Sequence, residues 1–154
     1  MTIKGGSGND KLYGGNLTAG KQFIEGNGDK DFITTAFWGD EAQADQFIWG
    51  DWNYGDDIDA QDEANEFWGH DDEIIGGDSA DMAHKQHIWA GDGDDKVTTG
   101  DGWAEAWVQG NDGNDHIQLG ENNAKAYAYG GAGDDTMKGP KDPSDGNVNE
   151  KMDG

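Results

Sequence analysis

The feature that most constrains this chain is a short turn, rich in glycine and aspartate, that recurs along it. Residues 130–135 read GGAGDD, and the apolar Met137 follows two places after the last aspartate. Glycines permit the positive-φ backbone of a tight turn, and Met137 would then point inward from a short strand. Related turns occur at residues 5–10 and 91–95, and versions whose core is one residue longer occur at 26–31 and 110–115. Five such turns in one chain predict a repeating architecture rather than isolated β-turns.

A second landmark, an apolar or aromatic pair just ahead of a glycine, recurs about every 20 residues, which is a period typical of solenoids. These glycines are Gly26, Gly50, Gly69, Gly91, Gly110 and Gly130. Each predicted coil therefore has a Gly/Asp turn, a short first strand, a second turn of different spelling and a second strand. The first strands are expected to begin at Leu12, Ile33, Ile58, Ile74, Val97, Ile117 and Met137.

This pattern predicts an all-β fold, namely a parallel β-roll or β-solenoid of about six to seven coils. The solenoid is expected to occupy residues 1–139. The turns at 50–57 and 69–72 are irregular, but the register of Ile58 and Ile74 indicates that the coils continue through them. Residues 140–154 lack apolar periodicity and are expected to form a C-terminal extension, as a cap or a disordered tail.

Alternation along the second strands predicts which side chains face inward. Because a thin roll has room inside only for small or aliphatic residues, the expected interior positions of the later coils are Ala104, Ala106, Val108, Ala124, Ala126 and Ala128. Trp103 falls on the opposite face, and Trp89 falls out of phase because its coil carries an extra residue. The expected outward aromatic column comprises Phe23, Phe47, Trp49, Trp68, Trp107, Tyr127 and Tyr129.

Two interpretations of this aromatic column stay open. In the first interpretation, the column is a platform on which sugar rings or a partner protein stack, because a large exposed apolar patch usually marks an interaction site. Alternatively, it is a ladder that stabilises its own sheet through cross-strand pairs. The candidate partner-binding residues are Phe47, Trp49, Trp68, Trp107, Tyr127 and Tyr129.

The charge of the chain excludes several classes of function. It has 33 acidic against 10 basic residues and a formal net charge of −23, which argues against nucleic acid or anionic lipid as a partner. Seven tryptophans and periodically placed acids argue against disorder. There is no cysteine, so a bound metal is the obvious alternative to a disulfide staple. Residues 1–20 hold no apolar segment typical of a signal peptide, and no stretch has the length of a membrane span.

The Gly/Asp turns carry the chemistry of a calcium site, because main-chain carbonyls and aspartate carboxylates are the hard oxygen ligands that Ca²⁺ prefers. We expect about four to six ions along the edge where these turns lie, and a metal-free, alanine-lined turn along the other edge. The candidate metal residues are Gly6, Gly8, Asn9, Asp10, Gly26, Gly28, Asp29, Asp31, Asp56, Asp72, Gly91, Gly93, Asp94, Asp95, Gly110, Gly113, Asn114, Asp115, Gly131, Gly133, Asp134 and Asp135.

The GGxGxDxU spelling of these turns, where U is apolar, resembles the nonapeptide repeat of the RTX (repeats-in-toxin) calcium-binding proteins. The resemblance extends from residue 5 to about residue 139. It implies a right-handed parallel β-roll, export through a type I system that ignores the N-terminus, and folding when the chain meets calcium outside the cell. The coil of about 20 residues is longer than that of a standard roll of this family.

The expected function is that of a non-enzymatic, calcium-dependent structural, adhesive or assembly module. The alternative is a carbohydrate-binding module that uses the aromatic column. An ice-binding solenoid ranks third, because the outward turn positions Ser7, Asn27, Asp92, Asn111 and Ala132 are too mixed for a flat array. No spelling typical of a hydrolase triad, a phosphate-binding loop or a zinc protease occurs. The four histidines, His70, His84, His87 and His116, lack the spacing of a transition-metal site, and His84 and His87 are expected in a solvated loop.

Overall fold

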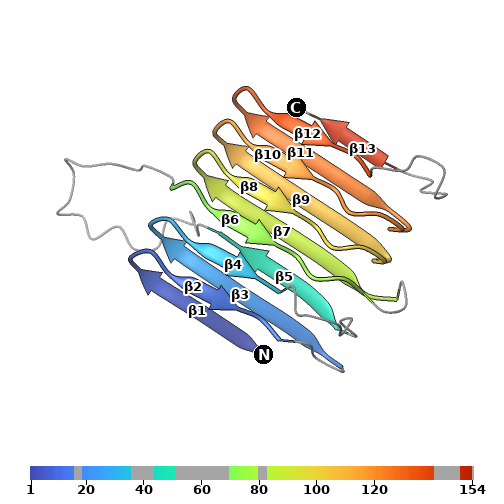
Figure 1. Ribbon diagram of the computed structural model, residues 1–154, viewed down its shortest axis with the longest axis horizontal. Helices are drawn as coiled ribbons and strands as arrows, with labels where there is room; N and C mark the ends of the chain where they lie inside the picture. The colour runs from blue at the N-terminus through green and yellow to red at the C-terminus, as the bar shows by residue number, and fades with distance from the viewer. Residues whose placement is uncertain (16–18, 36–43, 51–69, 80–82, 141–149, 154) are drawn as a thin grey trace.

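The chain folds into a stack of parallel strands arranged in two sheets (Figure 1). The computed structural model describes residues 1–15, 19–35, 44–50, 70–79, 83–140 and 150–153, referred to below as the described residues. One sheet has seven strands in the order β1-β3-β5-β7-β9-β11-β13, and the other has six in the order β12-β10-β8-β6-β4-β2. The strands of the first sheet are β1 (Thr2–Ser7), β3 (Lys21–Gly28), β5 (Asp45–Trp49), β7 (Lys85–Asp92), β9 (Glu105–Asp112), β11 (Ala126–Ala132) and β13 (Glu150–Asp153). Those of the second are β2 (Lys11–Tyr13), β4 (Phe32–Thr34), β6 (Glu73–Ile75), β8 (Lys96–Thr98), β10 (His116–Gln118) and β12 (Thr136–Lys138).

Consecutive strands alternate between the two sheets, so each long strand with the short strand after it forms one coil. Neighbouring coils pair in parallel, and the coils follow one another from the N-terminal end of the stack to the C-terminal end (Figure 1). The prediction of an all-β parallel solenoid is confirmed, and the number of coils is close to the expected six to seven. Among the described residues, no helix is long and apolar enough to cross a membrane.

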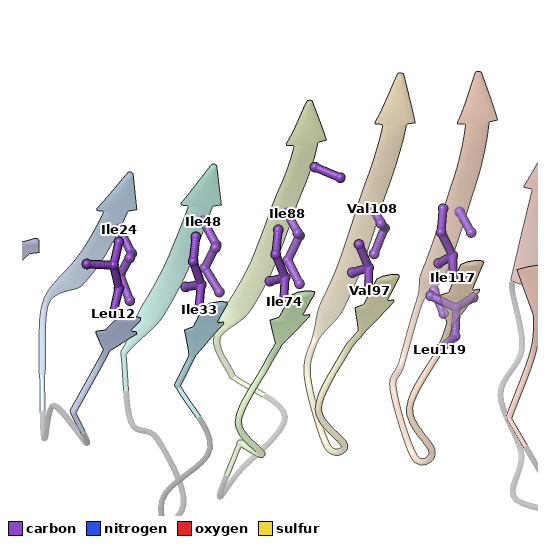
Figure 2. Packing of buried hydrophobic residues seen from close by; sticks show 13 residues of the cluster. Leu12, Ile24, Ile33, Ile48, Ile74, Ile88, Val97, Val108, Ile117 and Leu119 are labelled. Carbon is purple, nitrogen blue, oxygen red and sulfur yellow. The ribbon is translucent and has the colours of Figure 1, made fainter. Parts of the chain in front are cut away.

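The core consists of two facing columns of aliphatic side chains, one from each sheet (Figure 2). Ile24, Ile48, Ile88 and Val108 project from the long strands, and Leu12, Ile33, Ile74, Val97 and Ile117 project from the short ones. The apolar residue that was predicted to begin each of these short strands lies at the centre of the strand, so the strands begin one residue earlier than predicted. Alternation with a period of two residues, together with small or aliphatic side chains, predicts this arrangement of mostly β-branched residues on both sides of a narrow interior.

The middle of the chain departs from the predicted coil arrangement. Strand β5 pairs directly with β7, and Phe47 is the partner of His87. Likewise β4 pairs directly with β6, and Ile33 is the partner of Ile74. The prediction that a coil beginning at Ile58 continues the stack between them is therefore wrong, because no strand separates these pairs. Gly69, Trp68 and Asp56, to which the prediction assigned a landmark, an aromatic rung and a ligand, lie outside the described residues.

The predicted phase of Trp89 is also wrong. Trp89 is the partner of Trp49 on one side and of Gln109 on the other, so its strand is in register with both neighbours. The register places Ala90, and not Gly91, beside Gly110, and Ala90 is fully buried. No extra residue is present in this coil: an alanine occupies the position that is a glycine in the other coils.

The second edge of the roll is polar rather than lined with alanine. Ala104 is half-buried and Ala124 is exposed, whereas Trp103, which was expected to point outward, is fully buried. The alternation fails there because these residues precede β9 and β11 and belong to the turns. Trp103 Nε1 donates to Gly77 O at 3.0 Å, so the buried indole keeps a hydrogen-bond partner.

Glutamines line the interior beside this edge. Gln22, Gln46 and Gln86 are almost completely buried. Gln86 Nε2 donates to Gln46 Oε1 at 2.8 Å, and Gln86 Oε1 accepts from Gly100 N at 3.0 Å. Gln46 and Gln86 thus satisfy each other and a turn amide, which offsets the cost of burying these two side chains.

The C-terminal residues extend the first sheet. Strand β13 pairs with β11 in parallel, and Ala126 is the partner of Glu150. A strand in this place covers the edge that β11 would otherwise expose. We retain the proposal that residues 140–154 form a cap on a single solenoid domain.

Candidate metal centre

The Gly/Asp turns all connect a long strand to the short strand that follows, so they line one edge of the roll. The strand register aligns the turns at 5–10, 26–31, 90–95, 110–115 and 130–135 residue by residue. We number the six positions of each turn from one to six, so that the last aspartate is at position six. All five turns have the same length, and the expectation that two of them are one residue longer is wrong.

Two positions of each aligned turn require a backbone conformation that side chains rarely adopt. Position two has φ of +131° at Gly6, +80° at Asn27, +120° at Gly91, +87° at Asn111 and +117° at Gly131. Position four has φ of +99° at Gly8, +74° at Asp29, +128° at Gly93, +138° at Gly113 and +140° at Gly133. Asparagine and aspartate tolerate positive φ better than other residues, so Asn27, Asn111 and Asp29 can substitute for glycine.

A sixth turn has the same scheme but is interrupted. Gly50 N donates to Trp89 O at 2.8 Å, which places Gly50 at position one. Asp72 N donates to Asp95 Oδ1, which places Asp72 at position six. Residues 69–72, which the sequence suggested to be a short turn, thus include the end of a turn that begins at Gly50.

The position-six aspartates form a continuous column along this edge. The main-chain N–H of each donates to Oδ1 of the aspartate in the next coil, as Asp10 does to Asp31 at 2.8 Å and Asp115 does to Asp135 at 3.0 Å. The steps between them are Asp31 to Asp72 at 2.7 Å, Asp72 to Asp95 at 2.7 Å and Asp95 to Asp115 at 3.0 Å. One carboxylate oxygen per coil is therefore used to hold neighbouring turns together.

The second carboxylate oxygen points toward the position-one residue of its own turn, close to a main-chain carbonyl oxygen of the neighbouring coil. Oδ2 of Asp31, Asp115 and Asp135 is buried and accepts no hydrogen bond within the described residues. The position-one glycine faces it: a β-carbon on Gly5 would lie 2.6 Å from Asp10 Oδ2 and 2.6 Å from Gly26 O. A buried carboxylate oxygen without a donor is costly unless a proton or a cation compensates it.

Burial shifts these carboxyl groups toward the protonated form. It raises the pKa of Asp115 from 3.8 to about 6. The hydrogen bond from Asp95 N lowers this pKa, whereas repulsion from Asp135 raises it further. Burial likewise raises the pKa of Asp31, where the hydrogen bond from Asp10 N opposes the shift. Stacked carboxylates about 4.8 Å apart repel one another, so the column at neutral pH calls for positive charge.

A second ladder runs through position five in the opposite direction. Asp94 N donates to Asp71 Oδ1 at 3.1 Å, and Asn114 N donates to Asp94 Oδ1 at 2.8 Å. Asp134 N then donates to Asn114 Oδ1 at 2.9 Å. These position-five side chains thus lean toward the following coil and the position-six side chains toward the preceding one, so each gap from Asp72 to Asp135 receives carboxylate or amide oxygens from both sides.

The carboxylate and carbonyl oxygens that meet at this edge fit a hard cation such as calcium. Within the described residues no three His, Asp or Glu side chains gather into one metal-sized group. A cation at this edge would therefore take most of its ligands from main-chain carbonyls, which is a ligand set suited to calcium and not to transition metals. The residues that would hold it are the position-six aspartates, the position-five side chains and the carbonyls around positions one to four.

The structure also indicates residues that the sequence did not assign to the site. Gly5 and Gly50 stand at position one, and Asp71 stands at position five. Gly28 and Asp112 occupy the outward position three beside Ser7 and Ala132, so the earlier assignment of Asn27 and Asn111 to that row is wrong. Only the strand register reveals this. Asn27 and Asn111 stand at position two, where the other turns have the glycine by which the sequences could have been aligned.

These pKa shifts set the pH dependence of the metal-free fold. Asp115 binds its proton more tightly in the folded chain than in the unfolded chain, so stability is highest at low pH and declines as pH rises from about 3.8 through about 6. In EDTA, raising pH from 5.5 to 7.5 should lower the free energy of unfolding by about 1 kcal/mol from Asp115 alone. Far-UV circular dichroism of the calcium-free chain through a pH titration measures it, as a fraction of β structure that falls as pH rises. Metal-free stability that increases over this interval would contradict the carboxylate column.

The outer face of the first sheet carries a second candidate site, a band of aromatic rings along the coils. Two cross-strand rows alternate, one through Phe23, Phe47, His87, Trp107 and Tyr127 and one through Trp49, Trp89 and Tyr129. His87 therefore lies on strand β7 among these rings and not in a solvated loop. All eight side chains are half-buried.

Many of these rings lie against one another in ways that hide their faces. Trp49 and Trp89 are 5.0 Å apart with planes 4° from parallel, and Phe23 and Phe47 are 5.3 Å apart at 14°. Ring faces stacked in this way turn their edges, and not their faces, toward solvent. Trp107 is tilted by 56° against Trp89 and by 47° against Tyr129, so its ring is not stacked face to face on either neighbour.

Comparison with known families identifies the turns. A family model of the RTX calcium-binding nonapeptide repeat matches the chain in four copies, at residues 2–16, 87–103, 107–123 and 127–139. The matched stretches contain the turns at 5–10, 90–95, 110–115 and 130–135. Neither the curated proteins nor the solved structures contain a match to the chain.

Proposed function

Since this chain contains four copies of the RTX calcium-binding repeat in a β-solenoid consistent with a β-roll, we propose that it is a non-enzymatic structural module that folds when calcium binds between its turns. The observation that supports this most directly is the position-six column, in which buried Oδ2 atoms of Asp31, Asp115 and Asp135 have no hydrogen-bond donor. Because each gap between turns joins two coils, binding of the metal and folding of the solenoid become one event.

The proposal extends to where the module works. RTX repeats are typical of secreted proteins, and a chain with a net charge of −23 resists compaction until cations bind. Millimolar calcium outside the cell matches the affinity range of extracellular calcium modules. The chain therefore stays expanded during export and folds extracellularly, where it serves as a rigid spacer, an adhesive element or a unit of a larger assembly.

Small-angle X-ray scattering tests the coupling of folding to calcium. In EDTA the radius of gyration should approach roughly 40 Å, the value for an unfolded chain of this length, and calcium should reduce it toward the roughly 15 Å of a compact domain. Magnesium at the same concentration is the control, since Mg²⁺ binds carbonyl-rich cages poorly. A compact particle in EDTA would contradict calcium-coupled folding.

The aromatic band supports the structural role. Stacked pairs such as Trp49 with Trp89 stabilise adjacent strands without any partner. Replacing Trp89 by alanine should therefore lower the free energy of unfolding in calcium by about 1–3 kcal/mol. The control is Tyr13→Ala on the second sheet, where the ring is 55% exposed and lies 6.2 Å from Phe32. Chemical denaturation of the two variants in calcium is the measurement, and equal losses would contradict the ladder.

The alternative is carbohydrate binding through the same band. It requires open ring faces, and Trp107, whose ring is tilted against Trp89 and Tyr129, is the candidate. Binding to a glycan array that is lost in Trp107→Ala, in a variant that keeps the calcium-dependent fold, would favour this alternative. The mostly stacked rings make the structural module the better supported of the two.

A further inference from the structure

One step of the acidic edge contains a cation of the protein itself, together with a histidine. Across the six turns, positions four and five hold glycine, asparagine or aspartate everywhere except in the two turns that face each other in the middle. There, Lys30 stands at position five of the turn at 26–31, and His70 stands at position four of the interrupted turn. We propose that these side chains make the step between Asp31 and Asp72 a joint that the protein closes without calcium.

The contacts across this step are one ion pair, from Lys30, and one imidazole–carboxylate contact, from His70. Lys30 Nζ lies 3.5 Å from Asp71 Oδ2, and His70 Nε2 lies 3.7 Å from Asp29 Oδ1. The two contacts run in opposite directions across the same gap, one from each turn. At position five, the gap between Asp31 and Asp72 thus has an ammonium group. The gaps of the later coils have carboxylate and amide oxygens at the same position.

The position-five ladder shows what the lysine changes. From Asp71 onward, each position-five side chain accepts the N–H of the following coil, as Asp94 does from Asn114. Lysine has no acceptor atom, so the ladder cannot pass through Lys30. Asp29 Oδ2 accepts instead from Gly8 N of the preceding coil at 2.7 Å, which secures the turn at 26–31 to the first coil through another contact.

The charge balance of this gap differs from that of the others. An ammonium group neutralises one carboxylate and repels a divalent ion, whereas oxygen-lined gaps attract it. The RTX repeat model agrees independently. It matches the turns on both sides of the joint but neither the turn at 26–31 nor the interrupted turn that ends at Asp72.

The inference rests on the proposed calcium-dependent fold and refines it. Calcium ions bind in an array between the later turns, at 70–72, 90–95, 110–115 and 130–135, whereas Lys30 holds the middle joint. Lys30 is thus a residue that determines which gap excludes calcium. The number of ions bound by the chain is smaller than the number of gaps for this reason.

The test is Lys30→Asn, which restores at position five the residue found at Asn9 and Asn114. Equilibrium dialysis with radioactive calcium should show about one more ion bound per chain than in the unaltered protein. The melting temperature should rise more steeply with calcium concentration than in the unaltered protein, because one more ion then stabilises the folded state. A second variant, Lys30→Asn combined with His70→Gly, removes the imidazole as well and should show the same gain.

The matched control is Lys4→Asn. Lys4 is 62% exposed, close to the 58% of Lys30, and it pairs with Glu25 at 2.6 Å between β1 and β3, before position one of both turns. The control should keep the original number of bound ions. If both Lys30 variants bind as many ions as the control, the joint does not exclude calcium and the inference is overturned. If the unaltered chain itself binds no calcium, the proposed function fails instead, so the two failures are distinguishable.

Discussion

Asp115→Asn should stabilise the calcium-free chain and weaken its response to calcium. Asparagine removes a buried charge whose pKa is raised to about 6, and its amide can donate to the Gly130 carbonyl that lines the same space. At pH 7.5 in EDTA the free energy of unfolding should therefore rise by up to about 3 kcal/mol. The calcium concentration at the folding midpoint should increase about tenfold or more, because a carboxylate ligand is lost.

Asp112→Asn is the control for this substitution. It makes the same change of charge in the same turn, but Asp112 is exposed at the outward position three. Its effects on metal-free stability and on the calcium midpoint should both be small. Calcium titrations of the two variants, followed by tryptophan fluorescence, provide the comparison. If Asp115→Asn destabilised the metal-free chain, the buried carboxylate would not be the element that calcium compensates.

Gly113→Ala should destabilise the calcium-loaded roll by several kcal/mol. Gly113 has φ of +138°, and a β-carbon there would overlap the carbonyl oxygen of Gly93 in the preceding coil. The positive φ alone costs about 1 kcal/mol for alanine. Displacing a turn carbonyl from the edge adds a larger cost, of the order seen for overpacked interiors. Thermal unfolding in saturating calcium measures the sum.

Gly8→Ala separates the two causes. Gly8 stands at the same position four with φ of +99°, but it belongs to the first coil, and a β-carbon there has no neighbour within 4 Å. The variant should lose only about 1 kcal/mol. Equal losses for Gly8→Ala and Gly113→Ala would mean that the close approach of successive turns contributes nothing to stability.

Many residues of the Gly/Asp edge could be predicted from the sequence, because the same glycines and aspartates recur in each turn. Asp10, Asp31, Asp72, Asp95, Asp115 and Asp135 were all candidates, and the structure brings them into one column. Alternation predicted the interior positions Ala106, Val108, Ala126 and Ala128 correctly, since it is a local property of each strand.

The predictions of coil number and phase were wrong because a local sequence pattern does not show which residues pair between coils. Gln46 bonds to Gln86, 40 residues later, and this spacing equals two periods of about 20 residues. A long insertion within one turn therefore looked like an additional coil at Ile58. Ala90 in place of the position-one glycine shifted the apparent phase of Trp89 for a similar reason.

Buried polar groups were the other source of error. Trp103 follows the alternation of its neighbours outward, yet a hydrogen bond to Gly77 O holds it inside the second edge. Gln22, Gln46 and Gln86 are polar residues that the sequence offered no reason to bury. Their burial depends on partners in other coils, and hydrophobic periodicity does not contain that information.

The most direct test of the account is far-UV circular dichroism through a calcium titration that begins in EDTA, with magnesium as the control. The account predicts a largely disordered spectrum in EDTA and a cooperative transition to β structure at roughly 0.1–1 mM calcium, with little response to magnesium. A full β spectrum in EDTA, unchanged by calcium, would contradict it. The Gly/Asp turns would then be turns alone, and the aliphatic core and aromatic band would hold the roll without metal.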